Sequence, residues 1–165
     1  MTGSAEQIAL LVSQVVARLA EREQRIYALR LQQLRQGIDP VVFLRHATLH
    51  LQLPDLGFIQ RLAEGDGDDP AVSALHEAWS WGVRVHISLH QQLLAALPRS
   101  KLLPLPLSFS DHLGHQVRLS ANRLLSYRDV ATLDPCWLIV GRKTLLTPLA
   151  KECLPTRHIQ LLRQE

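Results

Sequence analysis

The chain contains few of the residues on which several classes of protein depend. Its 165 residues include two cysteines, Cys136 and Cys153, whose isolation predicts buried thiols rather than a disulfide. Aromatic residues make up 5% of the chain, too few and too far apart to form stacking platforms for nucleic-acid bases. The arginines behind the formal net charge of +3 are scattered rather than clustered. We therefore expect no nucleic-acid binding.

Long apolar runs are also missing. No stretch approaches the roughly 20 apolar residues of a membrane-spanning helix, so we expect no membrane association. The first residues lack the basic segment and the continuous apolar segment of a secretory signal. Together with the isolated cysteines, these features predict a protein of the cytosol or of a compartment within it.

The sequence has none of the glycine-rich loops that bind phosphate groups. Gly65 and Gly67 stand in an acidic turn that would repel phosphate. Ser88 and Ser110 have histidine neighbours but lack the glycines of a nucleophile elbow. We therefore assign no catalytic and no cofactor-binding residues, and we predict that the protein is not an enzyme.

Histidine, a common metal ligand, occurs eight times in the chain. The spacings that could suit a metal ion are those of His46 with His50, His86 with His90, and Asp111 with His112 and His115. The first pair lies in a predicted strand and the second spans a strand–helix junction. Neither pair has the flanking glutamate of the zinc-peptidase pattern. We therefore assign no metal site.

An amphipathic helix near the start of the chain is the clearest feature that is present. Residues 4–20 place six aliphatic side chains on one continuous face of a helix. This face, which we call the N-terminal stripe, consists of Ile8, Leu11, Val12, Val15, Val16 and Leu19. Ser4 and Gln7 have the spacing of a capping box. Because a helix of this length is marginal alone in water, the stripe must be buried against its own domain or against another protein.

The rest of the chain alternates between strand and helix patterns, and its 47% hydrophobic content suits a folded core. Expected strands cover residues 26–31, 41–53, 83–87, 107–110, 115–119, 136–140 and 158–162. Expected helices cover residues 55–63, 70–81, 89–97, 126–133 and a short segment from 148. This alternation predicts an α/β (or α+β) fold, a compact mixed-sheet domain with flanking helices. We assign residues 1–25 to the N-terminal docking helix and linker, and residues 26–165 to the α/β domain.

Local signals mark several helix starts and turns. Asp69-Pro70 and Thr147-Pro148 each place an N-cap residue before a proline at the first helical position. The segment 111–114 reads as the turn of a hairpin, in which Gly114 supplies a positive φ. Residues 136–140 form a continuous apolar run typical of a central strand. Pro155 is expected to precede the last strand.

Several stretches across the chain carry a resemblance to one protein family. They are residues 7–19, 62–65, 82–90, 105–107 with 109–111, 124–127 with 129–131, 147–150 and 159–165. Over most of its length the chain resembles the propanediol-utilisation bacterial microcompartment proteins. The resemblance implies a minor component of a protein-shelled organelle in the bacterial cytoplasm, which encloses cobalamin-dependent diol dehydratase and aldehyde-processing enzymes. It implies a role in assembly of that body rather than in a reaction, and we expect no cofactor.

The resemblance also implies a use for the N-terminal stripe, because short amphipathic helices are the usual means by which microcompartment cargo docks. Our leading hypothesis is an adaptor that contacts shell proteins, encapsulated enzymes or both. Burial of six aliphatic side chains is worth about 9–18 kcal/mol gross. Association and ordering costs remove much of this, which leaves a micromolar contact strengthened by avidity.

Three alternatives remain open. In the first, the N-terminal stripe packs on its own sheet. In the second, the chain is a small-molecule or cofactor module that binds a flavin or nucleotide at the strand ends. The residues near those ends are Ser88, His90, Ser110, Asp111 and Gly141. In the third, scattered arginines tether RNA or the nucleoid, and binding falls steeply with salt.

Overall fold

The computed structural model describes residues 2–164. Met1, the first residue of the expected segment 1–25, and Glu165, the last residue of the expected segment 26–165, lie outside the described residues. The helices are α1 (Thr2–Gln24), α2 (Leu31–Arg35), α3 (Pro40–Arg45), α4 (Leu56–Glu64), α5 (Pro70–Ser80), the 3₁₀ helix η1 (Gln91–Ala96), α6 (Arg99–Leu102), α7 (Tyr127–Ala131) and α8 (Pro148–Thr156). The strands are β1 (Ile26–Arg30), β2 (Thr48–Gln52), β3 (Arg84–Leu89), β4 (Leu107–Asp111), β5 (Gln116–Leu119), β6 (Leu124–Leu125), β7 (Cys136–Val140), β8 (Leu145–Leu146) and β9 (Gln160–Arg163).

Seven strands form one sheet in the order β1-β2-β3-β4-β5-β7-β9. Neighbouring strands are parallel except β4 and β5, which form the expected antiparallel hairpin. Gly114 in its turn has φ +92°, a conformation that glycine adopts without strain. The short strands β6 and β8 pair separately. The α/β fold with a mixed sheet and flanking helices is therefore confirmed.

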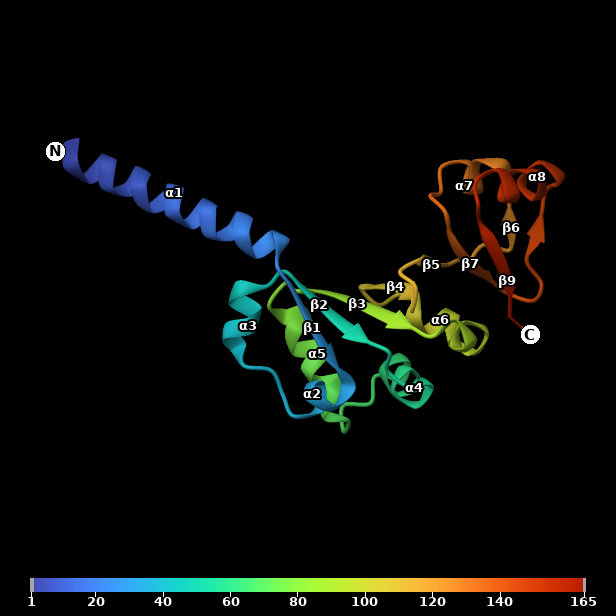
Figure 1. The fold of residues 1–165 in the computed structure, drawn as a ribbon, viewed down its shortest axis with the longest axis horizontal. Coiled ribbons are helices and arrows are strands. Elements are labelled where there is room, and N and C mark those ends of the chain that lie inside the picture. Colours follow the sequence, from blue (N-terminus) through green and yellow to red (C-terminus); the bar gives the residue numbers. More distant parts are fainter. Residues whose placement is uncertain (1, 165) are drawn as a thin grey trace.

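The two halves of the sheet are covered on opposite faces. The larger core cluster buries Leu49, Leu51 and Ile87 of the first strands against α4 and α5. In β7 the alternate residues Cys136 and Leu138 instead belong to a second cluster with α7 and α8. Figure 1 shows α7 and α8 together beside the C-terminal strands, far from α5. The face of β1–β4 opposite α4 and α5 is consequently left uncovered.

Three of the expected helix starts are confirmed, each with a capping side chain. The Asp55 carboxylate accepts from the Phe58 N–H at 2.7 Å, and that of Asp69 accepts from the Ala71 N–H at 2.9 Å. The Thr147 hydroxyl accepts from the Ala150 N–H at 3.2 Å. Each side chain satisfies one of the N–H groups that the first turn of a helix leaves without a partner.

The expected strand 41–53 is wrong in its first half. Pro40–Arg45 forms α3, and the Asp39 side chain caps it by accepting from the Val41 N–H at 2.9 Å. The Asp39-Pro40 pair is the same start signal as Asp69-Pro70, and it outweighs the β-branched residues that follow. Only Thr48–Gln52 forms the strand.

Other expected boundaries also need correction. Helix α1 begins at Thr2, so Ser4 lies inside the helix and the capping box predicted there is wrong. The expected helix 89–97 is a 3₁₀ helix, and the connector after it contains α6. Pro155 precedes the last strand as expected, and it lies in the last turn of α8. The last strand then begins at Gln160.

Candidate docking surface

Helix α1 carries the largest set of exposed apolar side chains in the described chain. The six members of the N-terminal stripe, Ile8, Leu11, Val12, Val15, Val16 and Leu19, are each between 55% and 61% exposed. Neither core cluster contains a described residue of α1. The alternative in which the stripe packs on its own sheet is therefore wrong for this structure. Sequence reasoning missed Leu10, which is 60% exposed on the opposite side of the helix.

The composition of α1 explains why it is a long, regular helix. Between Ala5 and Gln24 it contains no glycine or proline and is rich in Ala, Leu, Gln, Glu and Arg, the residues of highest helix propensity. Its 23 residues extend about 34 Å. Figure 1 shows it projecting from the domain, with only its C-terminal end in contact with the rest of the chain.

That C-terminal end is anchored by two charged side chains. The Arg22 guanidinium donates to the Phe43 carbonyl at 3.0 Å and to the Trp81 carbonyl at 3.3 Å. Glu23 pairs with Arg84 of β3 at 2.6 Å. Arg22 and Glu23 follow Leu19 at i+3 and i+4, which places them on the side of the helix that carries the N-terminal stripe. The stripe therefore runs toward the edge of the domain.

Two exposed apolar residues lie at this edge. Trp81 is 42% exposed and Leu44, next to Phe43 in α3, is 59% exposed. The Trp81 ring packs against Phe43 with the ring centroids 6.0 Å apart. The sequence pattern predicted that residue 44 is part of a strand. The exposed apolar surface of α1 therefore continues to the edge of the domain.

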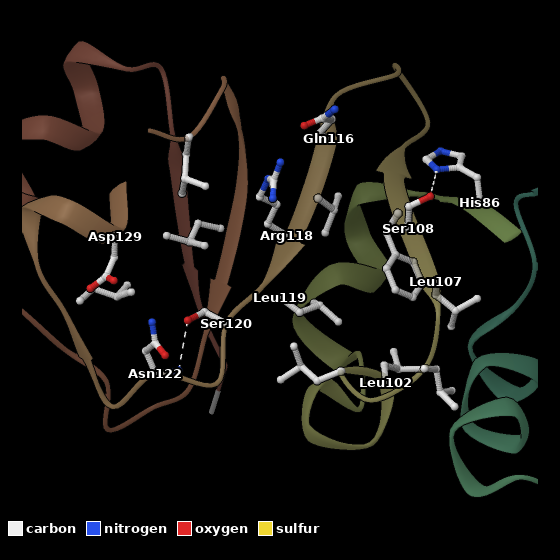
Figure 2. Close-up of a pocket in the computed structure, with 17 residues that line it drawn as sticks. His86, Leu102, Leu107, Ser108, Gln116, Arg118, Leu119, Ser120, Asn122 and Asp129 are labelled. Atoms are coloured by element: carbon white, nitrogen blue, oxygen red, sulfur yellow. Dashed lines mark hydrogen bonds between the residues drawn. The ribbon is translucent and has the colours of Figure 1, made fainter. Parts of the chain in front are cut away.

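A cavity of about 540 Å³ lies between the two halves of the sheet. Figure 2 shows Leu102, Leu107 and Leu119 lining one side of it, with Asp129 on the opposite side. The two charged residues that line it, Arg118 and Asp129, are both exposed. None of the five strand-end residues proposed for cofactor binding lines this cavity. The cavity is therefore lined by both apolar and polar side chains, and neither of its two charged residues is buried.

The uncovered face of the sheet brings two histidines together. His50 and His86 occupy matching positions on β2 and β3, and their ring centroids are 5.1 Å apart. The ring nitrogens of His86 lie 2.7 Å from the Ser108 hydroxyl and 2.8 Å from the Ser110 hydroxyl. Burial lowers the pKa of both histidines, and the charge of His50 lowers that of His86 further. The pair is therefore held toward its neutral form.

The members of the two histidine pairs considered in the sequence contact other side chains in the structure. His46 ends α3 and its ring lies against Tyr27, while His50 faces His86 instead. His90 stacks on His112 with centroids 4.2 Å apart. Within residues 2–164, no three His, Cys, Asp or Glu side chains are grouped as a metal ion would require.

Contacts with neighbouring groups explain why the Asp111 carboxylate is buried. Its carboxylate accepts from the N–H groups of Leu113 and His115 at 2.9 and 2.8 Å, from the Trp137 indole at 3.0 Å, and contacts the His115 ring at 2.9 Å. Burial alone would raise the pKa of Asp111, but these contacts outweigh it and lower the pKa to about 2. The carboxylate therefore fixes the β4–β5 turn against β7.

Gly141 and the two cysteines also have structural explanations. A Cβ added at Gly141 would lie 2.7 Å from the Arg99 guanidinium, so the glycine permits close approach of that side chain. Cys136 is buried and Cys153 half-buried, and both are free thiols. Burial raises the pKa of Cys136, which favours the unreactive thiol form.

Comparison with known proteins identifies the family. Residues 10–160 match a family described as putative propanediol utilisation. The chain belongs to this propanediol-utilisation family. Two relatives, from Salmonella typhimurium and Citrobacter freundii, are each 40% identical over 160 residues, which is 97% of this chain and 98% of theirs. Both are named bacterial microcompartment assembly protein PduM, and the chain is a PduM-type protein.

No solved structure matches this propanediol-utilisation protein. The resemblance seen in its sequence is confirmed by the family match and by the two relatives. Among the helices formed by residues 2–164, none combines the length and the apolar character needed to cross a bilayer.

Proposed function

We propose that this protein is a non-enzymatic assembly component of the propanediol-utilisation bacterial microcompartment, within the bacterial cytoplasm. It acts as an adaptor between shell proteins and enzyme cargo. The N-terminal stripe docks on one component, and the α/β domain contacts a second. Membership of the family and the names of the two relatives support the assembly role.

The observation that carries the docking role is the exposure of the N-terminal stripe. Contiguous apolar surface on a soluble domain usually marks an interaction site. Val12 and Val15, at the centre of the stripe, are 56% and 55% exposed, and no other part of the described chain covers them. A partner that receives the stripe in an apolar groove gains the burial of all six side chains, as in other helix-in-groove contacts.

A charge placed in the middle of the stripe separates docking from folding. Val15→Glu puts a carboxylate where the partner's apolar groove would close, so we expect co-sedimentation with purified microcompartments to fall by about tenfold or more. Because Val15 lies outside both core clusters, the melting temperature in dilute solution should change by no more than about 2 °C.

Ser13→Glu is the matched control, since it adds the same charge to the same helix at a position outside the N-terminal stripe. This variant should sediment with microcompartments as the unchanged protein does. Equal sedimentation of the two variants would refute docking through the stripe. A large fall in the melting temperature of Val15→Glu would instead show that the stripe belongs to the core.

The cofactor alternative has less support. Its five residues do not line the cavity between the halves of the sheet, and Asp111 and Gly141 are explained by local packing. We therefore propose no cofactor and no catalytic residues for this protein.

A further inference from the structure

We propose that α1 also binds α1 of a second copy of this chain, antiparallel, through the N-terminal stripe. The stripe is symmetric about the midpoint between Ser13 and Gln14. Turned end for end on a second copy, Ile8 lies opposite Leu19 of the partner subunit and Val12 lies opposite Val15 of the partner subunit, along the centre of the contact. Leu11 and Val16 lie on its two flanks, so all six aliphatic side chains line the contact. A surface that is complementary to itself in this way suits a two-fold symmetric dimer.

The length of α1 supports the same register. When the stripes are aligned, Gly3 lies opposite Gln24 of the partner subunit, which is the last residue of α1. The described helix therefore ends close to where the partner's domain begins. This fit matters because Arg22 and Glu23, on the stripe side of the helix, already bind the domain through Phe43, Trp81 and Arg84. A helix shifted further along would run into that edge.

Charge and domain position favour the antiparallel arrangement over the parallel one. Antiparallel pairing holds the two attachment points about 30 Å apart along the helix axis, whereas parallel pairing places both domains at the same end of the stripe. Antiparallel helix dipoles attract each other. Arg18 borders the stripe, and the two Arg18 side chains lie about 13 Å apart along the axis in this register. The pairing therefore brings no like charges into contact.

Self-pairing goes beyond the proposed function and does not depend on it. The same six side chains serve both contacts, so a copy that docks on a microcompartment component must first leave the dimer. The dimer keeps the stripe out of water in the free protein. Docking on a microcompartment component therefore competes with dimer formation. By mass action, a higher concentration of this protein favours the dimer and weakens docking.

The test exploits the pairing of position 8 with position 19. Sedimentation equilibrium of the purified full chain should give a dimer mass that falls to the monomer on dilution. Ile8→Glu and Leu19→Lys each place one unpaired charge opposite an aliphatic side chain, and each should weaken the dimer by more than about tenfold. The double variant I8E/L19K sets Glu opposite Lys of the partner subunit only in the antiparallel register. It should restore most of the dimer.

Leu10→Glu is the control, because Leu10 lies on the side of α1 away from the stripe; this variant should remain dimeric. A double variant that stays monomeric would overturn the antiparallel pairing, since parallel helices set Glu opposite Glu. A monomer mass for the unchanged protein at every concentration would overturn self-pairing altogether. Neither result bears on docking, because the purified chain contains no shell or cargo protein.

Discussion

At the scale of single residues, His50 and His86 show how position in the sheet controls charge. The two rings meet because Thr48–Gln52 and Arg84–Ser88 align in parallel register. Sequence spacing instead paired His46 with His50 and His86 with His90. The observed pairing could not be predicted, because it depends on which strands are neighbours and not on distance along the chain. No helix covers this face, but both rings are half-buried among their neighbours in the sheet, and this burial lowers the pKa of each histidine.

These two histidines predict how stability depends on pH. Their pKa values in the folded protein lie below the ordinary 6.5, so the unfolded chain binds more protons in that window. The free energy of unfolding should therefore decrease as the pH falls below about 6.5, and level off below the folded pKa values.

Urea denaturation between pH 7.5 and 5 measures this dependence. The double variant His50→Gln/His86→Gln removes both groups and should show a shallower loss of stability over the same range. If the two proteins lost stability in parallel, the histidines would not be responsible.

At the scale of elements, local chemistry explains which helices could be predicted. Asp55, Asp69 and Thr147 mark helix starts that the sequence predicts and the structure shows. Asp39-Pro40 carries the same information, but the β-branched Val41 and Val42 led to the prediction of a strand. The short helices α2 and α6 and the paired strands β6 and β8 have too few residues to show a period, so they were not predicted.

Two of these caps differ in what else the side chain holds. Asp39 only caps α3, and Asp39→Ala should reduce the free energy of unfolding by about 1 kcal/mol. Asp69 caps α5 and also accepts from the Arg61 guanidinium of α4 at 2.7 Å. Asp69→Ala removes both interactions from a buried position and should cost about 2–3 kcal/mol. The difference in urea midpoint between the two variants measures this, and equal midpoints would show that the Arg61 contact adds nothing.

At the scale of the whole molecule, the sequence predicts the class of the fold but not the arrangement of its parts. Alternating strand and helix patterns indicate a mixed sheet, and the hairpin at Gly114 accounts for its single antiparallel pair. Helices cover one face of the sheet at β1–β4 and the opposite face at β7. This difference depends on contacts between residues far apart in the chain, which the hydrophobic period of a single segment cannot predict. The amphipathic pattern of α1 predicts the N-terminal stripe, but only the structure shows that the domain does not cover it.

Removal of residues 1–20 tests most directly whether α1 serves contacts with other proteins rather than the fold. The measurement is the fraction of protein that co-sediments with purified microcompartments, compared between the truncated and full-length chains. We predict that the truncated chain stays in the supernatant while its domain remains folded, because the anchoring residues Arg22 and Glu23 are retained. Equal sedimentation of the two chains would contradict it.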